Sequence, residues 1–315
     1  MPPFSNVCSI IITLHKNKSI HLGDNFFTGI YIVVKKSAII GINNCKEDKD
    51  MPSQYAHNKF GKLVIPNLHP FMKSVIKKYP RAFRIGLQGP DFLFFNLTHK
   101  NVYHLGQDLH HMDAYGFMEH AIHVIREFGL NSPQYSYIMG FICHFVLDSS
   151  CHPYINKFMK STGCGHVEIE GDLENLIMSS ENLAPEFYPL YKLVPTDFDT
   201  AFAMSPFYKG ISILTIQDSL IWMKRLKKLF VAPSDSKRKL INFGFHASFH
   251  YDKLNGHMVL PHANEKCRKE TIMLYDILKL SADDAVKLIN NFTLSLNKIS
   301  MLSNEFHRDF SGNIW

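Results

Sequence analysis

The chain has 315 residues, of which 46% are hydrophobic and 20% charged, and its formal net charge is +6. This composition is typical of a globular protein with a large core and argues against a disordered chain. The charge is too small for a nucleic-acid-binding stripe, although it permits contact with anionic phosphates or a lipid surface. Eighteen histidines are an unusual number and favour metal chemistry.

The six cysteines include no C-x-x-C pair, and in a chain of this size they do not indicate a disulfide framework. We expect Cys143 and Cys151 to pack as small hydrophobic residues, and Cys164 to be a packing or loop thiol despite its position near His166. The sequence shows no apolar run of about 18 residues and no secretory signal pattern. We therefore expect no membrane span. The predicted location is cytoplasmic or unknown.

Residues 1–50 differ from the remainder of the chain. The runs 9–14 and 30–42 are rich in β-branched residues and are consistent with a hairpin or an edge strand. The alternative is that this segment is not native or is poorly ordered, because residues 46–48 can be encoded by a purine run resembling a bacterial ribosome-binding site. We expect translation to start at Met51 and residues 51–315 to form a single helical domain.

Helical patterns begin after Met51. Ser53 is a candidate N-cap for a short helix that carries His57 and ends near Gly61, and residues 70–79 form a second helix. Residues 85–91 read IGLQGPD, in which two glycines and a proline predict a tight loop before Asp91. Asp91 is either the N-cap of the next helix or a metal ligand, and the sequence alone favours the cap.

Four histidines follow in residues 96–112, and Asp113 is a candidate cap for a helix over 114–128 that Gly129 ends. The next helix begins with Ser132 as cap and Pro133 in the first turn. Residues 135–147 are apolar on nearly every face, which predicts a central, buried helix. The four histidines in residues 96–112, which precede both of these helices, are His99, His104, His110 and His111.

The stretch 140–170 carries the ligand pattern. His144, Asp148 and His152 are four residues apart, as are His166 and Glu170. Residues at this spacing lie on one face of a helix, and imidazole nitrogen with carboxylate oxygen suits zinc. A single His-x-x-x-Asp is usually only a hydrogen-bonded pair, but two such pairs in one short stretch favour a metal site. The buried carboxylate of Asp148 in particular needs a cation.

Pro153 predicts that this helix breaks at His152, so that His152 serves a different ion from His144. We expect Asp172 and Glu174 to lie on a solvated face. A helix over 211–232 has a basic end that includes Lys227, for which a solvated face is favoured over contact with phosphates or lipid. Residues 234–239 are expected to form a charged loop, and helices over 269–280 and 282–301 close the chain.

Six motifs carry a resemblance to a known family. They are MPSQYAHNKFG (51–61), IGLQGPD (85–91), LHH (109–111), GFICHFVLDSSCHPYI (140–155), HVEIE (166–170) and the weaker LNGHMVLP (254–261). Together they resemble the bacterial zinc-dependent phospholipase C family. The resemblance implies an all-α, multi-helix bundle around zinc ions that bind the substrate phosphate, a fold similar to that of the single-strand-specific zinc nucleases.

The resemblance also implies the ligand set and its division among about two to three zinc ions. Asp148 is expected to bridge two ions, and His57 to share the third ion with it. His110 is preferred to His104 and His111 from its place before the capped helix. The implied metal ligands are His57, Asp91, His110, His144, Asp148, His152, His166 and Glu170.

The resemblance implies hydrolysis of a phospholipid or a related phosphodiester, with Asp91 as the residue that orients or deprotonates water. One alternative is a phosphodiesterase similar to the zinc nucleases. Another is a non-catalytic module that binds metal or membrane. We expect a phosphate-ester substrate and possible peripheral membrane contact, and no stable nucleic-acid partner.

Overall fold

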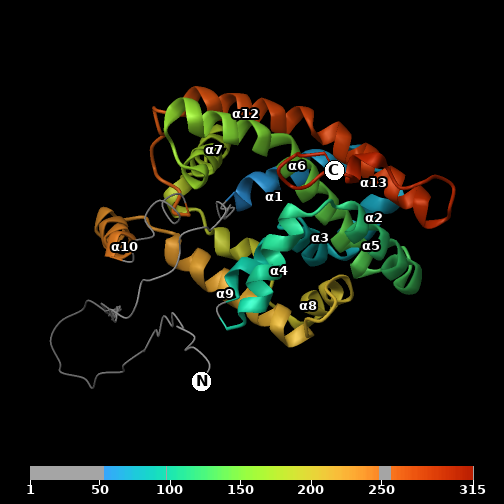
Figure 1. Ribbon diagram of the computed structural model, residues 1–315. Coiled ribbons are helices and arrows are strands. Elements are labelled where there is room, and N and C mark those ends of the chain that lie inside the picture. Colours follow the sequence, from blue (N-terminus) through green and yellow to red (C-terminus); the bar gives the residue numbers. More distant parts are fainter. Residues whose placement is uncertain (1–52, 97, 248–256, 315) are drawn as a thin grey trace, which may run out of the picture.

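A computed structural model describes residues 53–96, 98–247 and 257–314, and the elements named within these ranges are all helices (Figure 1). The all-α prediction is confirmed. The expectations for residues 1–50 lie outside the described residues. In the described ranges, no helix combines the length and the apolar character needed to cross a membrane.

The helices run in the following order. The α-helices are α1 (Gln54–Val64), α2 (Pro70–Lys78), α3 (Pro80–Gly86), α4 (Lys100–His111), α5 (Tyr115–Phe128), α6 (Pro133–Thr162), α7 (His166–Ser180), α8 (Phe198–Met204), α9 (Ile213–Phe230), α10 (Asp235–Ala247), α12 (Arg268–Leu280) and α13 (Ala282–Leu296). The 3-10 helices are η1 (Ile65–Asn67), η2 (Asp91–Phe95), η3 (Pro185–Phe187), η4 (Leu190–Leu193), η5 (Ser205–Phe207) and η6 (Asn304–Phe306).

Helix α6 is the central element, and α1, α3, α5, α12 and α13 all pack against it (Figure 1). It has 30 residues, which makes it about 45 Å long at the usual rise per residue. Ser132 accepts a hydrogen bond from the amide of Tyr135, and Gly163 ends the helix in the left-handed conformation with φ 71°. The predicted start and the predicted burial of this helix are therefore confirmed.

The predicted break at His152 is wrong, because α6 continues through Pro153 to Thr162. A proline inside a helix removes the hydrogen bond to the carbonyl four residues earlier, which here belongs to Ser149. The C-terminal tail covers this position: a Cβ on Gly312 would lie 2.5 Å from the Ser149 oxygen and 2.7 Å from the Pro153 ring. Tertiary packing thus overrides the local preference of the sequence, and His152 stays on the same helix as His144.

Helices α3 and α6 touch through their backbones. A Cβ on Gly86 would lie 2.2 Å from the carbonyl oxygen of Tyr137, and one on Gly140 would lie 2.3 Å from that of Phe83. Only glycine permits this approach at both positions. Because α3 leads directly into the loop before Asp91, the contact brings that loop onto the face of α6 that carries His144.

Two further local predictions are wrong. Residues 234–239 are not a loop, because α10 begins at Asp235 and the Ser234 hydroxyl accepts a hydrogen bond from the amide of Lys237. Asp113 does not cap the following helix; its carboxylate lies 2.9 Å from Nδ1 of His307. Asp113 takes a tertiary partner in place of the local cap, whereas α10 begins with a local cap at Ser234.

Candidate metal centre

The eight predicted ligands come from five elements and meet inside the bundle. His57 is on α1, Asp91 on η2 and His110 on α4, while α6 and α7 supply the other five, and every one of the eight is buried. In the described part of the chain their donor atoms form three groups, within each of which the atoms lie no more than 4.8 Å apart. The groups are His57, His144 and Asp148; Asp91, His110 and His144; and His152, His166 and Glu170.

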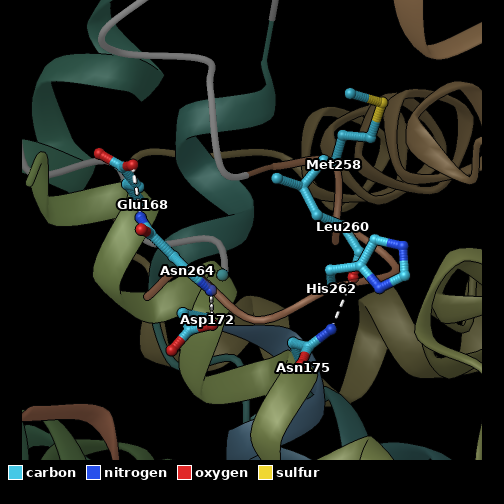
Figure 2. Close-up of a pocket in the computed structure, with 8 residues that line it drawn as sticks. Glu168, Asp172, Asn175, Met258, Leu260, His262 and Asn264 are labelled. Carbon is cyan, nitrogen blue, oxygen red and sulfur yellow. Dashed lines mark hydrogen bonds between the residues drawn. The ribbon is translucent and has the colours of Figure 1, made fainter. Parts of the chain in front are cut away.

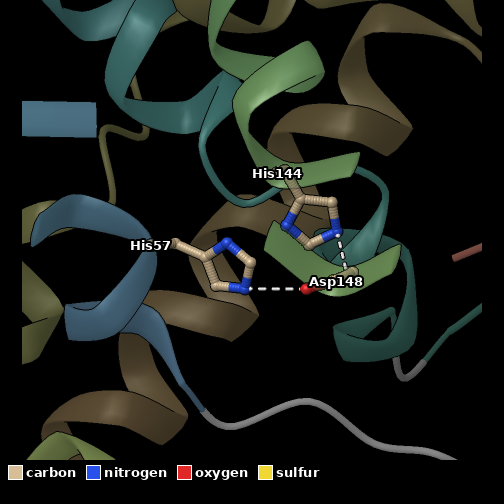
Figure 3. A group of neighbouring side chains, drawn as sticks. All are labelled: His57, His144 and Asp148. Carbon is tan, nitrogen blue, oxygen red and sulfur yellow. Dashed lines mark ion pairs between the residues drawn. The ribbon is translucent and has the colours of Figure 1, made fainter. Parts of the chain in front are cut away.

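The first group joins α1 to α6 (Figure 3). Nε2 of His57 lies 3.2 Å from Oδ1 of Asp148, and Nε2 of His144 lies 3.1 Å from Oδ2 of the same carboxylate. The two imidazole rings stack at 4.5 Å between centroids. Asp148 therefore presents one oxygen to each imidazole, an arrangement in which a single carboxylate can serve two positions.

The second group joins η2 and α4 to α6. Nε2 of His110 lies 3.0 Å from Oδ1 of Asp91, and Nε2 of His144 lies 3.7 Å from the same oxygen. Nδ1 of His110 is 2.7 Å from the carbonyl of Gly106 and must donate its proton there. A neutral His110 then has only a lone pair at Nε2, facing a carboxylate lone pair, so the site needs a proton or a metal ion between them.

The structure also decides among the neighbouring histidines on α4. His104 and His111 are both exposed, and each lies close to the side chain or carbonyl of Gln107. His110 alone among these three points into the bundle, as predicted from its position in the chain.

The third group joins α6 to α7. Oε1 of Glu170 lies 3.2 Å from Nε2 of His166 and 3.7 Å from Nε2 of His152, and the two rings are 5.1 Å apart. His166 and Glu170 are one turn apart on α7, which is the geometry that their spacing predicted. Because α6 stays helical through Pro153, His152 reaches this group from the turn after Asp148.

Without a metal ion, the carboxylates and imidazoles shift one another's pKa values. Burial raises the pKa of the Glu170 carboxyl, but His166 and His152 outweigh burial and lower it to about 2. Burial also raises the pKa of the Asp148 carboxyl, but His144 and His57 outweigh burial and hold this pKa well below its usual value. Burial lowers the pKa of His57, yet Asp148 outweighs it and the pKa is raised overall. The carboxylates therefore stay charged and hold positive charge beside them.

The residues fit a metal ion by the chemistry and the direction of their donors. Within the described ranges, both ring nitrogens of His57 and of His144, Oδ2 of Asp148 and Oε2 of Glu170 are buried without a hydrogen-bond partner. Nε2 of His144 and Oδ2 of Asp148 lie only 3.1 Å apart, yet neither atom has a hydrogen-bond partner. Unpaired buried donors are costly, and an ion that they share would satisfy them. Nitrogen and carboxylate oxygen together suit zinc.

Glu174 and Lys227 form a buried layer next to these groups that the sequence did not reveal. Glu174 was expected on a solvated face, but it is 1% exposed and accepts a hydrogen bond from the amide of Tyr55 in the first turn of α1. Lys227, expected on the solvated basic end of α9, is 2% exposed, with its ammonium 5.9 Å from the ring centroid of Phe95. A signal existed: Glu174 continues the four-residue spacing of His166 and Glu170.

Asp172 was also expected in solvent and is buried. Its carboxylate accepts hydrogen bonds of 2.7 Å from the amide of Asn264 and from the hydroxyl of Thr271. Asp172 therefore attaches α7 to α12 and the segment before it. The predictions for Asp172 and Glu174 failed because α7 is covered by α1 on one flank and by α12 on another.

A small pocket lies on the outer side of α7 (Figure 2). Its carboxylates are already occupied: Glu168 accepts from the side chain of Asn264 at 2.6 Å and from the amide of Gly165 at 3.1 Å. Asn175 donates to the carbonyl of Leu260 at 2.7 Å. These contacts hold the segment 260–264 against α7, so the polar groups of the pocket serve to attach this segment. Cys164 belongs to this region and to none of the three ligand groups.

Comparison with known proteins assigns the family. Residues 56–258, well over half of the chain, match the family model of zinc dependent phospholipase C. Searches of curated proteins and of solved structures gave no match. The match covers the positions of all eight predicted ligands, whose assignment as ligands is a prediction from the sequence pattern and the geometry. The chain belongs to the zinc-dependent phospholipase C family.

Proposed function

We propose that this protein hydrolyses a phosphate ester with the help of about two to three zinc ions, and that a phospholipid is its preferred substrate. Hydrolysis of the bond between diacylglycerol and phosphate would release diacylglycerol and a phosphorylated head group. The observation that carries the proposal is the convergence of three buried His and carboxylate groups on one stretch of α6 and its neighbours. Zinc held there would supply positive charge and Lewis acidity toward the phosphate.

The position of each predicted ligand suggests its part in holding the ions. His144 and Asp148 stand at the centre because His144 belongs to two groups and Asp148 meets His57 with its other oxygen. Glu170 holds the third group together from α7. Since α6 contributes to all three groups, the roughly two helical turns between His144 and His152 fix the spacing between them.

Asp91 is the candidate general base. Its carboxylate sits at the start of η2, beside His110 and His144, and is 3% exposed. A carboxylate held by two imidazoles at the edge of the ligand groups can accept the proton of an attacking water and return it to the leaving group. The N-cap of η2 is Pro90, with no side-chain cap, so the prediction that Asp91 caps this helix is wrong; its carboxylate faces His110 and His144 instead.

A nuclease similar in fold remains the second reading of the family resemblance, but no specific contact favours it. Two described aromatic rings lie close to His110: Phe310 at 4.9 Å, which is 2% exposed and also 5.5 Å from His144, and Phe94 at 5.0 Å, which is partly exposed. Phe310 is committed to packing and is not available to stack on a base, so a nuclease would depend on Phe94 for stacking.

The test is a comparison of three substrates on zinc-loaded protein: phosphatidylcholine, a soluble chromogenic phosphodiester and single-stranded DNA. We expect turnover of phosphatidylcholine and of the soluble diester, both abolished by Asp91→Asn. Preference for DNA would identify a nuclease. Absence of turnover of all three with full zinc content would identify a non-catalytic metal-binding module.

A further inference from the structure

Helix α10 carries large apolar side chains on its solvent-facing side. Leu240 is 65% exposed and Phe243 is 72% exposed. They are three residues apart and so lie on the same face of the helix. Lys239, on the same side, is also exposed. Solvent-facing positions of a helix in a globular protein are normally polar, so this face is suited to a partner that accepts apolar groups.

The opposite face of α10 is anchored, which keeps the apolar face directed outward. Ile241 packs against a small buried cluster of Phe230, Ala232 and Met258. The side chains of Lys237 and Arg238 donate to the carbonyls of Val231 and Ala232 at the end of α9. The helix is therefore fixed in its orientation by both apolar packing and hydrogen bonds.

Lys239 supplies positive charge on the exposed side of α10, next to Leu240 in the chain. Arg225 and Lys228 are exposed on the last turns of α9, the helix that precedes α10 (Figure 1). The one carboxylate of α10, Asp235, is paired with Arg238. An apolar stripe with basic residues at its border is the pattern of helices that lie in the interface of an anionic bilayer.

The same region is connected to the ligand groups. The ring of His257 stacks on Phe230 at 5.6 Å, and its neighbour Met258 both supports α10 and lines the pocket on the outer side of α7. Helix α7 carries His166 and Glu170. A surface bound through α10 would therefore lie on the side of the molecule where Met258 connects α10 to the pocket on α7.

We propose that the α10 face of Leu240, Phe243 and Lys239 docks the protein on an anionic phospholipid surface. The two apolar side chains enter the interfacial layer, and the basic residues remain at the level of the head groups. A second protein is a poorer fit, because two side chains cover far less than the roughly 800 Å² that a stable interface buries on each partner. The inference rests on the proposed function only in taking phospholipid as the substrate class.

The experiment is co-sedimentation of the zinc-loaded full chain with vesicles of phosphatidylcholine, with and without phosphatidylglycerol. We expect binding that is stronger on the anionic vesicles. The double variant Leu240→Ser/Phe243→Ser should lower the partition coefficient about tenfold or more. Lys239→Glu should lower it about fivefold or more on anionic vesicles alone, and added salt should remove that difference.

The matched control is Leu280→Ser/Ile299→Ser, which removes two apolar side chains that are 76% and 70% exposed near the C-terminal helices. It should bind vesicles as the unmodified protein does. All variants should hydrolyse a soluble phosphodiester at the unmodified rate, which shows that they are folded.

Three results would overturn the proposal: no binding of the unmodified protein to either vesicle, equal loss of binding in the α10 and control variants, or concentration-dependent dimerisation that only the α10 variant abolishes. The last would make a second copy the partner. Vesicle binding without hydrolysis of any substrate would instead remove the proposed function and leave the docking surface in place.

Discussion

The imidazole of His144 rests directly against the backbone of Gly89. Gly89 has φ 47°, and a Cβ built on it would lie 2.0 Å from Cδ2 of His144. The loop before Asp91 thus has a glycine for two reasons: the backbone is left-handed, and the His144 ring occupies the place of a side chain. His144 is held in its orientation by the same loop that delivers Asp91.

Gly89→Ala should therefore displace His144 and disturb two ligand groups. The left-handed backbone alone costs about 1–2 kcal/mol, and the overlap with the ring adds to that. We expect a lower melting temperature and a loss of bound zinc, measured by thermal unfolding and elemental analysis. Gly116→Ala is the control, because Gly116 is helical and has no atom within 4 Å of its missing Cβ. That change should stabilise by up to about 1 kcal/mol.

Asp148 and His57 should differ in importance, since Asp148 meets two imidazoles and His57 meets one carboxylate. Asp148→Asn keeps the shape and removes the charge. It should lower the zinc content by more than one ion and reduce activity by more than about 100-fold. His57→Gln should lose less zinc and keep measurable activity, because the group of His152, His166 and Glu170 is untouched.

Equal losses of zinc and rate in the Asp148 and His57 variants would contradict this division. Cys164→Ser serves as the control in the same measurements. Its thiol lies 3.8 Å from the side-chain nitrogen of Asn264 and outside the ligand groups, so neither zinc content nor rate should change.

Removal of zinc should destabilise the protein. The buried carboxylates of Asp148 and Glu170 would then depend on protonated imidazoles alone, and ligands that bind only the folded state stabilise it by mass action. Chelation should lower the melting temperature by about 5–10 °C for a protein of this size. Re-addition of zinc should restore it, whereas a chelator-independent melting curve would show that these groups hold no ion.

Much of the fold, and the clustering of the proposed site residues, could be predicted from sequence because the signals were local. The cap at Ser132, the apolar run after it and the four-residue spacing of His144, Asp148 and Glu170 with their partners each depend on one helix. Helical periodicity alone then places the side chains on one face. The meeting of Asp91 and His57 with these residues was expected from the family resemblance and not from spacing.

The features that could not be predicted from sequence depend on packing between elements that are distant in the chain. Pro153 stays within α6 because the C-terminal tail covers the carbonyl that it leaves unpaired. Glu174 and Lys227 have the composition of surface residues, yet α7 and α9 are enclosed by other helices at these positions. A charged residue in a helix is predicted to face solvent unless its partner is known, and the partner of Glu174 is the first turn of α1.

Glu174 should give the metal-free protein a specific pH dependence. Burial raises its pKa from the ordinary value of 4.5 to about 7, although Lys227 and the amides of Tyr55 and Ala56 act in the opposite direction. An acid whose pKa is raised by folding stabilises the folded state below the unfolded pKa. That contribution is lost as the pH rises through the folded pKa.

The contribution of Glu174 to the free energy of unfolding should therefore fall by up to about 3 kcal/mol between pH 4.5 and pH 7. Glu174→Gln keeps a carbonyl oxygen for the amide of Tyr55 and removes the titration. Denaturant unfolding of both proteins at intervals from pH 5 to pH 8, in the presence of chelator, isolates this term as the difference between the two curves. The difference should shift in favour of the variant as the pH rises to about 7 and should level off above that pH. A constant difference would mean that Glu174 is ionised throughout, held by Lys227 despite its burial.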